Sequence, residues 1–162
     1  MPRKKTPRPE RPHIPGYGIP DSRKGLLPWS WAEQRLKNSH NYWLITTSPD
    51  SRPHAMPVWG IWVDSVFYFS TGRTSRKARN LTRSPQCVVC NERTHEAVIL
   101  HGQAEEIRDP KLIADLGKPY YRKYKPWKLD PAMGAIFAVR PAVAFGMYEK
   151  KYATSATRWI FQ

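Results

Sequence analysis

Short runs of β-branched and aromatic residues, separated by turn residues, follow one another along most of this chain. Such runs are typical of strands, and their close spacing is typical of antiparallel sheets. We therefore expect a mainly β fold with about six to eight short strands and a few helices, arranged as a small antiparallel barrel rather than a doubly wound sheet. The expected strands are 42–47, 52–63, 66–71, 86–91, 97–107, 135–139, 142–148 and 157–161, and the expected helices are 31–39, 75–83 and 110–124.

Prolines and capping residues mark the expected element boundaries. Pro53 and Pro57 interrupt the strand 52–63, and because each lacks a backbone donor, part of this strand should lie at an edge, a bulge or a kink that faces a ligand. The pair 64–65 predicts a tight hairpin. Ser30 with Glu33 resembles a capping box for the first helix, and Asp109 is a plausible cap for the last.

An aromatic strand leads into a polar, cationic turn. The run 66–69 is followed by Ser70 and Thr71, and then by a helix start that contains Ser75, Arg76 and Lys77. Hydroxyl groups, the free N–H groups of a first helical turn and cationic side chains all favour a phosphate dianion. The segment therefore predicts the anchor of a phosphorylated cofactor.

Helical spacing limits which cations can contact one anion. On a helix, residues 76, 79 and 80 share a face whereas 77 points elsewhere. We expect Arg76 and Lys77 to be ligands and Arg79 and Arg83 to lie on a solvated face, with Arg73 in the preceding turn adding positive charge.

The chain is strongly basic, with a formal net charge of +14 at pH 7. This charge favours a polyanionic partner, such as nucleic acid, an acidic membrane surface or a small molecule that carries phosphate. No long apolar window and no apolar signal core are present, so we expect a soluble, cytoplasmic protein. Residues 1–28 are rich in proline and in cations and should form an arm that is flexible or lies over the surface, whereas 29–162 should form one domain.

Metal and nucleophile motifs are lacking. Cys87 and Cys90 flank two valines in a strand-like run, where they should point to opposite faces as small strand residues. The histidines show no metal-ligand spacing, although His54 is placed to hydrogen-bond a cofactor or a substrate. No nucleophile elbow or phosphate-loop motif appears, which removes hydrolase and kinase interpretations.

Several segments together resemble the pyridoxamine 5′-phosphate oxidase-like split β-barrel family. They are Arg52-Pro53-His54-Ala55-Met56-Pro57-Val58-Trp59, Phe69-Ser70-Thr71-Gly72, Ser75-Arg76-Lys77-Ala78-Arg79-Asn80-Leu81 with Ser84-Pro85, and Thr157-Arg158-Trp159. The resemblance covers about 31–162 and implies a split barrel that forms a homodimer with two cofactor sites at the subunit interface. The cofactor of this family is usually FMN, and in many actinobacterial relatives it is the deazaflavin coenzyme F-420.

The resemblance also implies a set of cofactor-binding residues. The residues carried over are His54, Met56, Pro57, Val58, Trp59, Ser70, Thr71, Ser75, Arg76, Lys77, Asn80 and Trp159. Arg76, Lys77 and Ser75 would hold the phosphate, and Trp159 would come from the partner subunit. Ala97 stands where the oxidases proper carry glutamine, so the resemblance implies hydride transfer with an unidentified small molecule rather than with pyridoxamine phosphate.

Two other classes of function remain open at this point. The chain could carry flavin without turnover, or it could bind nucleic acid through the basic arm and the basic, aromatic segment 118–128. Tyr120, Tyr121 and Tyr124 in that segment either close over a substrate or lie on an ordinary solvated helix face, and the solvated face is our expectation.

Overall fold

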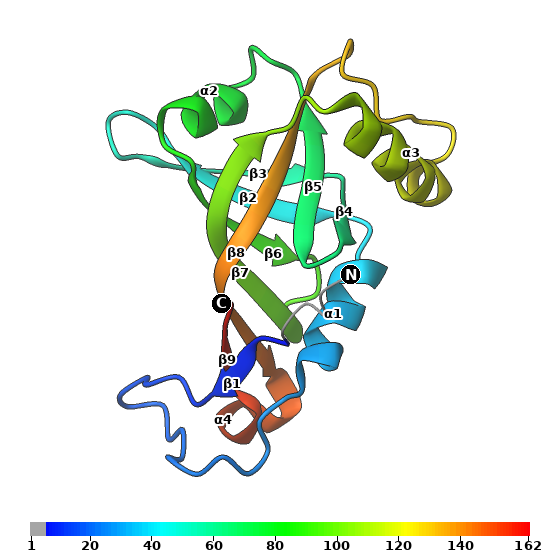
Figure 1. The fold of residues 1–162 in the computed structure, drawn as a ribbon. Coiled ribbons are helices and arrows are strands. Elements are labelled where there is room, and N and C mark those ends of the chain that lie inside the picture. The colour runs from blue at the N-terminus through cyan, green and yellow to red at the C-terminus, as the bar shows by residue number, and fades with distance from the viewer. Residues whose placement is uncertain (1–5) are drawn as a thin grey trace.

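The computed structural model describes residues 6–162, which form a curved, barrel-like antiparallel sheet with helices around its rim (Figure 1). Its strands are β1 (Arg8–Glu10), β2 (Tyr42–Thr47), β3 (Pro53–Val58), β4 (Gly60–Val63), β5 (Val66–Thr71), β6 (Gln86–Asn91), β7 (Glu96–Glu106), β8 (Ala135–Tyr148) and β9 (Thr157–Ile160). Its helices are α1 (Trp29–Asn38), α2 (Arg76–Arg83), α3 (Pro110–Tyr124) and α4 (Tyr152–Ser155), with a 3-10 turn at Glu149–Lys151. None of the helices in this described part is long and apolar enough to cross a membrane.

The barrel is split between two strands that are adjacent in the chain. Hydrogen-bonded neighbours run β3, β2, β6, β7, β8, and β8 also pairs with β5, which pairs with β4. The expected strand 52–63 is broken at Trp59, where the chain leaves β3 and enters β4 on the other side of the gap. Within 6–162, β3 therefore has one sheet neighbour and one free edge, as its two prolines predict.

Local turn and cap signals are confirmed at most boundaries. Asp64 and Ser65 have φ values of 52° and 62°, the left-handed conformation that a tight hairpin between β4 and β5 requires. Asp109 caps α3, since its carboxylate accepts from the Lys111 N–H at 3.0 Å. The capping box at Ser30 is wrong. Helix α1 begins at Trp29 after Pro28, and the Glu33 carboxylate instead accepts from the Trp62 indole N–H at 3.2 Å.

The C-terminal half differs from the expected strand pattern in one place. Segments 135–139 and 142–148 form a single strand, β8, that pairs with β7 along its whole length. The register shifts between His101, which pairs with Val143, and Gly102, which pairs with Pro141, so Ala142 forms a bulge next to the proline that the sequence suggests as a strand end.

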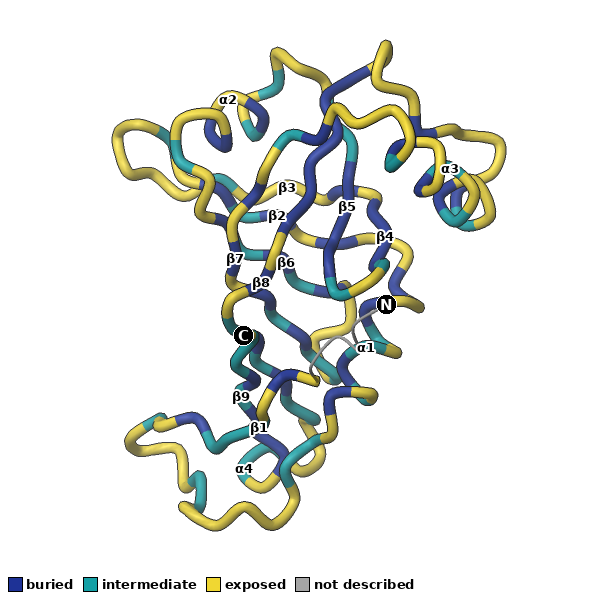
Figure 2. The backbone as a smooth tube through the Cα atoms, in the orientation of Figure 1, coloured by how far each residue is buried: buried dark blue, intermediate teal, exposed yellow. Residues whose placement is uncertain are grey.

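Apolar side chains form two cores, one on each face of strands β5 and β8. The larger core fills the barrel around Tyr42, Phe67 and Phe69, and the smaller one lies between α3 and the β4–β5 hairpin around Tyr68 and Tyr124. Figure 2 shows the buried stretches concentrated along β5 and β8, whereas the turns at the rim are exposed. The strands are thus held firmly while their ends and the first turn of α2 remain accessible.

The basic N-terminal segment is anchored to the body between residues 6 and 28. Strand β1 pairs with β9, and the Arg11 guanidinium donates to the carbonyls of Ser22, Lys24, Thr154 and Ala156. The described part of the arm, 6–28, is therefore attached to the body by a strand pairing and by the hydrogen bonds of Arg11. Residues 1–5 of the arm lie outside the described residues.

Candidate functional site

A hollow lies in the gap of the split barrel, and we call it the β3–β5 crevice. Its volume is about 360 Å³, and it is lined by Asn41, Pro57, Val58, Trp59, Ser70, Thr71, Lys77 and Tyr120. The end of β3, the end of β5, the start of α2 and the middle of α3 meet here. Six residues that the resemblance predicts as cofactor ligands are therefore brought together: Pro57, Val58, Trp59, Ser70, Thr71 and Lys77.

Hydroxyl groups organise the turn between β5 and α2. Ser75 caps the helix, and its hydroxyl accepts from the Ala78 N–H at 3.2 Å. The Thr71 and Ser75 hydroxyls lie 3.1 Å apart, which ties the end of the strand to the helix start. The first turn of α2 carries Arg76 and Lys77 and no acidic residue. Cations at a helix N-terminus oppose the helix dipole, so a bound anion would relieve an unfavourable arrangement.

Arg76 and Lys77 lie in different hollows. The Lys77 side chain lines the β3–β5 crevice, is only partly exposed and has no ion-pair partner among the described residues. The Arg76 side chain lines a second hollow on the other side of α2, together with Arg79 and Asn80. Arg76 and Lys77 therefore do not point toward one place where a single phosphate could contact both. Their separation follows from helical spacing, because adjacent residues of a helix point in different directions.

Two more residues predicted near the phosphate have other partners. The Asn80 side chain is buried and donates to the Thr46 hydroxyl at 3.0 Å, which attaches α2 to β2. Arg73 forms an ion pair with Glu106, and Glu106 also pairs with Arg108 at 3.0 Å. These hydrogen bonds hold the pKa of the Glu106 carboxyl below its usual value. The charge of Arg73 is therefore already balanced, and it does not line the β3–β5 crevice.

His54 and Met56 lie on β3 beside the crevice but do not line it. They pair with Thr46 and Leu44, both buried, and therefore share the face of the sheet that looks into the barrel. The His54 Nδ1 atom is buried without a hydrogen-bond partner, and Met56 is 42% exposed. A buried polar atom without a hydrogen-bond partner lowers the stability of the fold. A polar ligand that formed a hydrogen bond with the His54 Nδ1 atom at this edge of the sheet would remove that cost.

The wall of the crevice opposite the turn between β5 and α2 is aromatic. The Trp59 ring stacks on the Tyr124 ring at a centroid distance of 4.8 Å and an angle of 10°. The Tyr124 hydroxyl accepts from the Gly60 N–H at 2.8 Å and donates to the His40 carbonyl at 2.7 Å. Trp62, which the sequence places on the opposite face from Trp59, is buried against Trp29. The break between β3 and β4 at Trp59 thus positions the Trp59 indole at the crevice and the Trp62 indole in the core.

A partly buried lysine holds α3 against the barrel next to this wall. The Lys123 Nζ donates to the Tyr42 hydroxyl at 2.7 Å and to the Gly60 carbonyl at 2.8 Å. Burial lowers the pKa of Lys123 to about 8, and the negative charge of Glu92 opposes that shift. Burial also raises the pKa of the Tyr42 and Tyr124 hydroxyls, so both stay neutral donors at neutral pH. This network fixes α3 and with it Tyr120 at the crevice.

Sequence reasoning missed two residues of the crevice lining. Asn41 precedes β2 and carries no sequence signal for a site. Tyr120 belongs to a segment that we expected to be a solvated helix face, yet its ring is buried. The sequence does contain a signal for a buried helix face here. Apolar or aromatic residues recur at helical spacing at Ile113, Leu116, Tyr120 and Tyr124, and all four are buried.

Trp159 does not reach the surface. Its indole is fully buried and packs against Trp29 at a centroid distance of 5.4 Å, and the Gly146 backbone lies directly beneath it. The ring therefore has no free face for a cofactor of this subunit or of a partner. The contact that the resemblance implies for Trp159 is replaced in this structure by a role in the barrel core.

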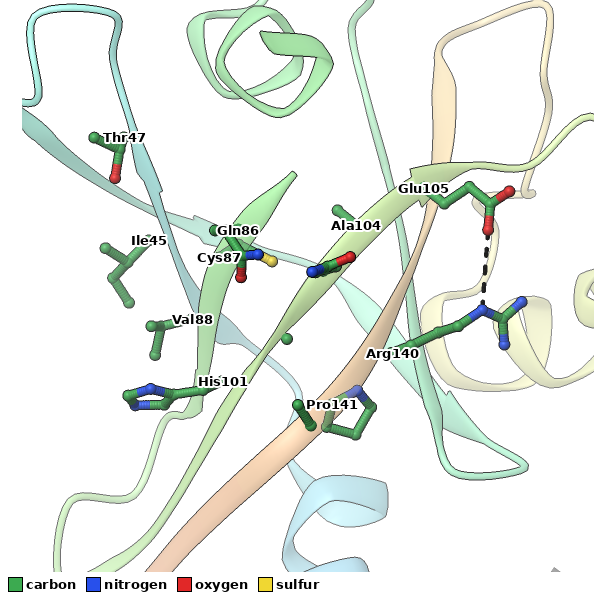
Figure 3. Close-up of a pocket in the computed structure, with 13 residues that line it drawn as sticks. Ile45, Thr47, Gln86, Cys87, Val88, His101, Ala104, Glu105, Arg140 and Pro141 are labelled. Atoms are coloured by element: carbon green, nitrogen blue, oxygen red, sulfur yellow. Dashed lines mark ion pairs between the residues drawn. The ribbon is translucent and has the colours of Figure 1, made fainter. Parts of the chain in front are cut away.

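Another hollow lies elsewhere, on the outer face of the sheet (Figure 3). It has a volume of about 670 Å³ and contains none of the predicted cofactor residues. Ile45, Val88 and His101 lie on one side of it, and the ion pair between Arg140 and Glu105 lies on the other. Its open, mixed lining and its position on the outside of the sheet are typical of a protein contact surface more than of a cofactor pocket.

This hollow is part of a broad apolar surface, which we call the outer face. Its residues alternate with core residues along the strands and are at least partly exposed: Trp43, Ile45, Ala55, Pro57, Val88, Cys90, Ile99, Val143 and Phe145. Trp43 at its centre is 48% exposed. Pro57 belongs both to this face and to the β3–β5 crevice, so the two surfaces are continuous.

The cysteines are free thiols on opposite faces of β6, as the spacing predicts. Cys87 faces the core and Cys90 the outer face, and burial raises the pKa of Cys87 to about 12. No group of histidine, cysteine or acidic side chains in residues 6–162 is arranged to hold a metal ion.

Comparisons with known proteins show which family has this fold and these segments. The profile of the pyridoxamine 5′-phosphate oxidase family matches residues 32–147. An F420 reductase of known structure is 24% identical with a TM-score of 0.57, and the match covers 69% of this chain and 94% of the reductase. No curated protein matches the chain.

Two further solved structures are similar. The conserved hypothetical protein Rv2991 from Mycobacterium tuberculosis is 21% identical with a TM-score of 0.68, over 77% of this chain and 87% of that protein. A heme-binding protein from Mycobacterium smegmatis is 16% identical with a TM-score of 0.60, over 80% of this chain and 62% of that protein. At these identities the likeness shows the fold alone. The profile match spans more than half of the chain and includes β3, β5 and the start of α2, so the chain belongs to the pyridoxamine 5′-phosphate oxidase family.

Proposed function

We propose that this chain binds FMN in the β3–β5 crevice and is an oxidoreductase that transfers hydride to or from a small molecule. The observation that carries the proposal is the Lys77 side chain. It is partly buried in the crevice beside Ser70 and Thr71, with no carboxylate partner among residues 6–162, in a family that binds flavin-type cofactors. The deazaflavin coenzyme F-420 is the alternative within the same site, and the similarity to an F420 reductase supports it.

The lining fits a phosphorylated, ring-containing cofactor. Lys77 with the Ser70 and Thr71 hydroxyls supplies a cation and hydrogen-bond donors for a phosphate and its polyol chain. The free edge of β3 at Pro57–Val58 offers backbone groups, and Trp59 with Tyr120 offers apolar surface for a ring. When bound, the cofactor supplies the hydride chemistry, which no side chain of the crevice supplies by itself. The chain's residues bind it, orient it and exclude water from one side.

We extend the proposal to a homodimer in which the outer face is the interface. An apolar surface of this extent is unusual on a monomer, and it runs into the crevice through Pro57. A second copy seated there would cover the open side of the crevice. Light scattering of the purified protein should give the mass of a dimer, and Trp43→Glu with Ile45→Glu should give a monomer, because two charges would enter an apolar contact.

The matched control for the interface is Trp127→Glu. Trp127 is 61% exposed in the loop after α3, away from the outer face. This variant should remain dimeric. A wild-type protein that is monomeric at tens of micromolar concentration would contradict the homodimer and leave the cofactor proposal to its own test.

Titration of apoprotein with FMN, coenzyme F-420 and riboflavin tests the cofactor proposal. We expect one of the two phosphorylated cofactors to bind at least about tenfold more tightly than riboflavin, because riboflavin lacks the phosphate that Lys77 would contact. The readout is quenching of cofactor fluorescence or calorimetry. Failure to bind either phosphorylated cofactor would refute the proposal. Tight binding without any acceleration of hydride transfer over the free cofactor would identify the protein as a flavin carrier.

A further inference from the structure

Helix α2 and the turn that joins β2 to β3 lie near each other (Figure 1), and residues of both line a second hollow, which we call the arginine crevice. Its volume is about 520 Å³, and it is lined by Ser48, Pro49, Asp50, Arg52, Arg76, Arg79, Asn80 and Arg83. It shares no lining residue with the β3–β5 crevice, because it lies on the opposite side of the first turn of α2.

The positive charge of this crevice is not balanced. Arg76, Arg79 and Arg83 lie on one face of α2, and none of them forms an ion pair with a carboxylate of the described residues. Asp50, the acidic side chain of the lining, already pairs with Arg52 at 2.9 Å. Like charges three and four positions apart destabilise a helix. An anion bound among these side chains would remove that repulsion.

The lining also indicates the chemical class of the anion. Guanidinium groups are planar forks that match phosphate oxygens with paired hydrogen bonds. Arg76, Arg79 and Arg83 follow one another along one face of α2, so several phosphate groups can be contacted at once. The lining contains no aromatic ring on which a base could stack. These features favour a short chain of phosphates over a nucleoside or a nucleic acid strand.

We propose that the arginine crevice is a second ligand site, separate from the cofactor crevice, that binds a short polyphosphate. The nearest alternative is that Arg79 and Arg83 form an ordinary solvated helix face, as the sequence alone suggests. The two interpretations differ in a measurable way. A solvated face binds anions weakly and in proportion to their charge, whereas a built site distinguishes tripolyphosphate from other anions and loses that preference when two of its arginines are removed.

Isothermal calorimetry with tripolyphosphate in 150 mM salt (about a physiological ionic strength) tests the site. We expect saturable binding at least about tenfold tighter than that of inorganic phosphate, and a loss of at least about tenfold in the variant Arg79→Gln with Arg83→Gln. Glutamine is a good helix former, so α2 should keep its structure. The melting temperature of the wild-type protein should rise with tripolyphosphate, and that of the variant should not.

The matched control is Lys118→Gln with Arg122→Gln, two exposed cations at the same spacing on α3. It removes the same charge and should leave tripolyphosphate binding unchanged. Equal losses in the two double variants would show nonspecific attraction to a basic protein and would overturn the proposal. Competition between FMN and tripolyphosphate would overturn it too, because the crevice would then be part of the cofactor site. Tighter binding of a single-stranded oligonucleotide than of tripolyphosphate would reassign the surface to nucleic acid.

Discussion

Replacing Lys77 with glutamine is expected to weaken FMN binding about 10- to 100-fold, whereas riboflavin binding stays unchanged. Lys77 is the one cation in the lining of the β3–β5 crevice, and no carboxylate of the described residues competes for it. A charge-assisted hydrogen bond to phosphate contributes about 1.5–3 kcal/mol, and riboflavin cannot form it. Fluorescence titration of the apoprotein with both ligands measures the difference directly.

The control for Lys77→Gln is Lys111→Gln, an exposed lysine at the start of α3. This variant has the same change in charge and should bind FMN as the wild type does. If Lys77→Gln lowered the affinities for FMN and riboflavin equally, Lys77 would shape the crevice rather than bind phosphate. If Arg76→Gln, and not Lys77→Gln, removed the preference for FMN, the phosphate would lie on the other side of α2.

Truncation of Trp159 to alanine is expected to lower the free energy of unfolding by about 3–5 kcal/mol. The side chain is fully buried and contacts Trp29, and a Cβ atom at Gly146 would lie only 2.6 Å from its ring. The strands around it cannot collapse into the vacated space, because β8 is paired on both sides there. Urea denaturation followed by circular dichroism measures the change.

Trp127→Ala is the matched control, because this indole is 61% exposed. The expected change in its free energy of unfolding is within about 0.5 kcal/mol. The pair also separates the two roles considered for Trp159. A variant Trp159→Ala with wild-type stability and weakened FMN binding would contradict the core position and support a cofactor contact across the subunit interface.

Local sequence signals predicted most elements of this fold because the cause of each element lies within a few residues. The Ser75 hydroxyl accepts from Ala78 three positions along the chain, and Asp64 with Ser65 has the left-handed backbone that the hairpin needs. The two prolines of β3 favour an edge, a bulge or a kink because each lacks a backbone donor, and the fold places the strand at a free edge. The false capping box at Ser30 shows the limit of this reasoning, because Glu33 interacts with Trp62 from another element.

The turn with its Ser75 cap, the interruption of the strand 52–63 and the mainly β fold were determined by the sequence, since they depend on backbone propensity, hydroxyl placement and missing donors. Tertiary structure alone decided that Tyr120 forms a wall of the crevice and that Trp159 lies in the core. It also decided that Arg11 attaches the N-terminal segment to carbonyls more than 140 residues away. Such contacts join distant parts of the chain, and their geometry depends on the packing of the whole barrel rather than on neighbouring residues.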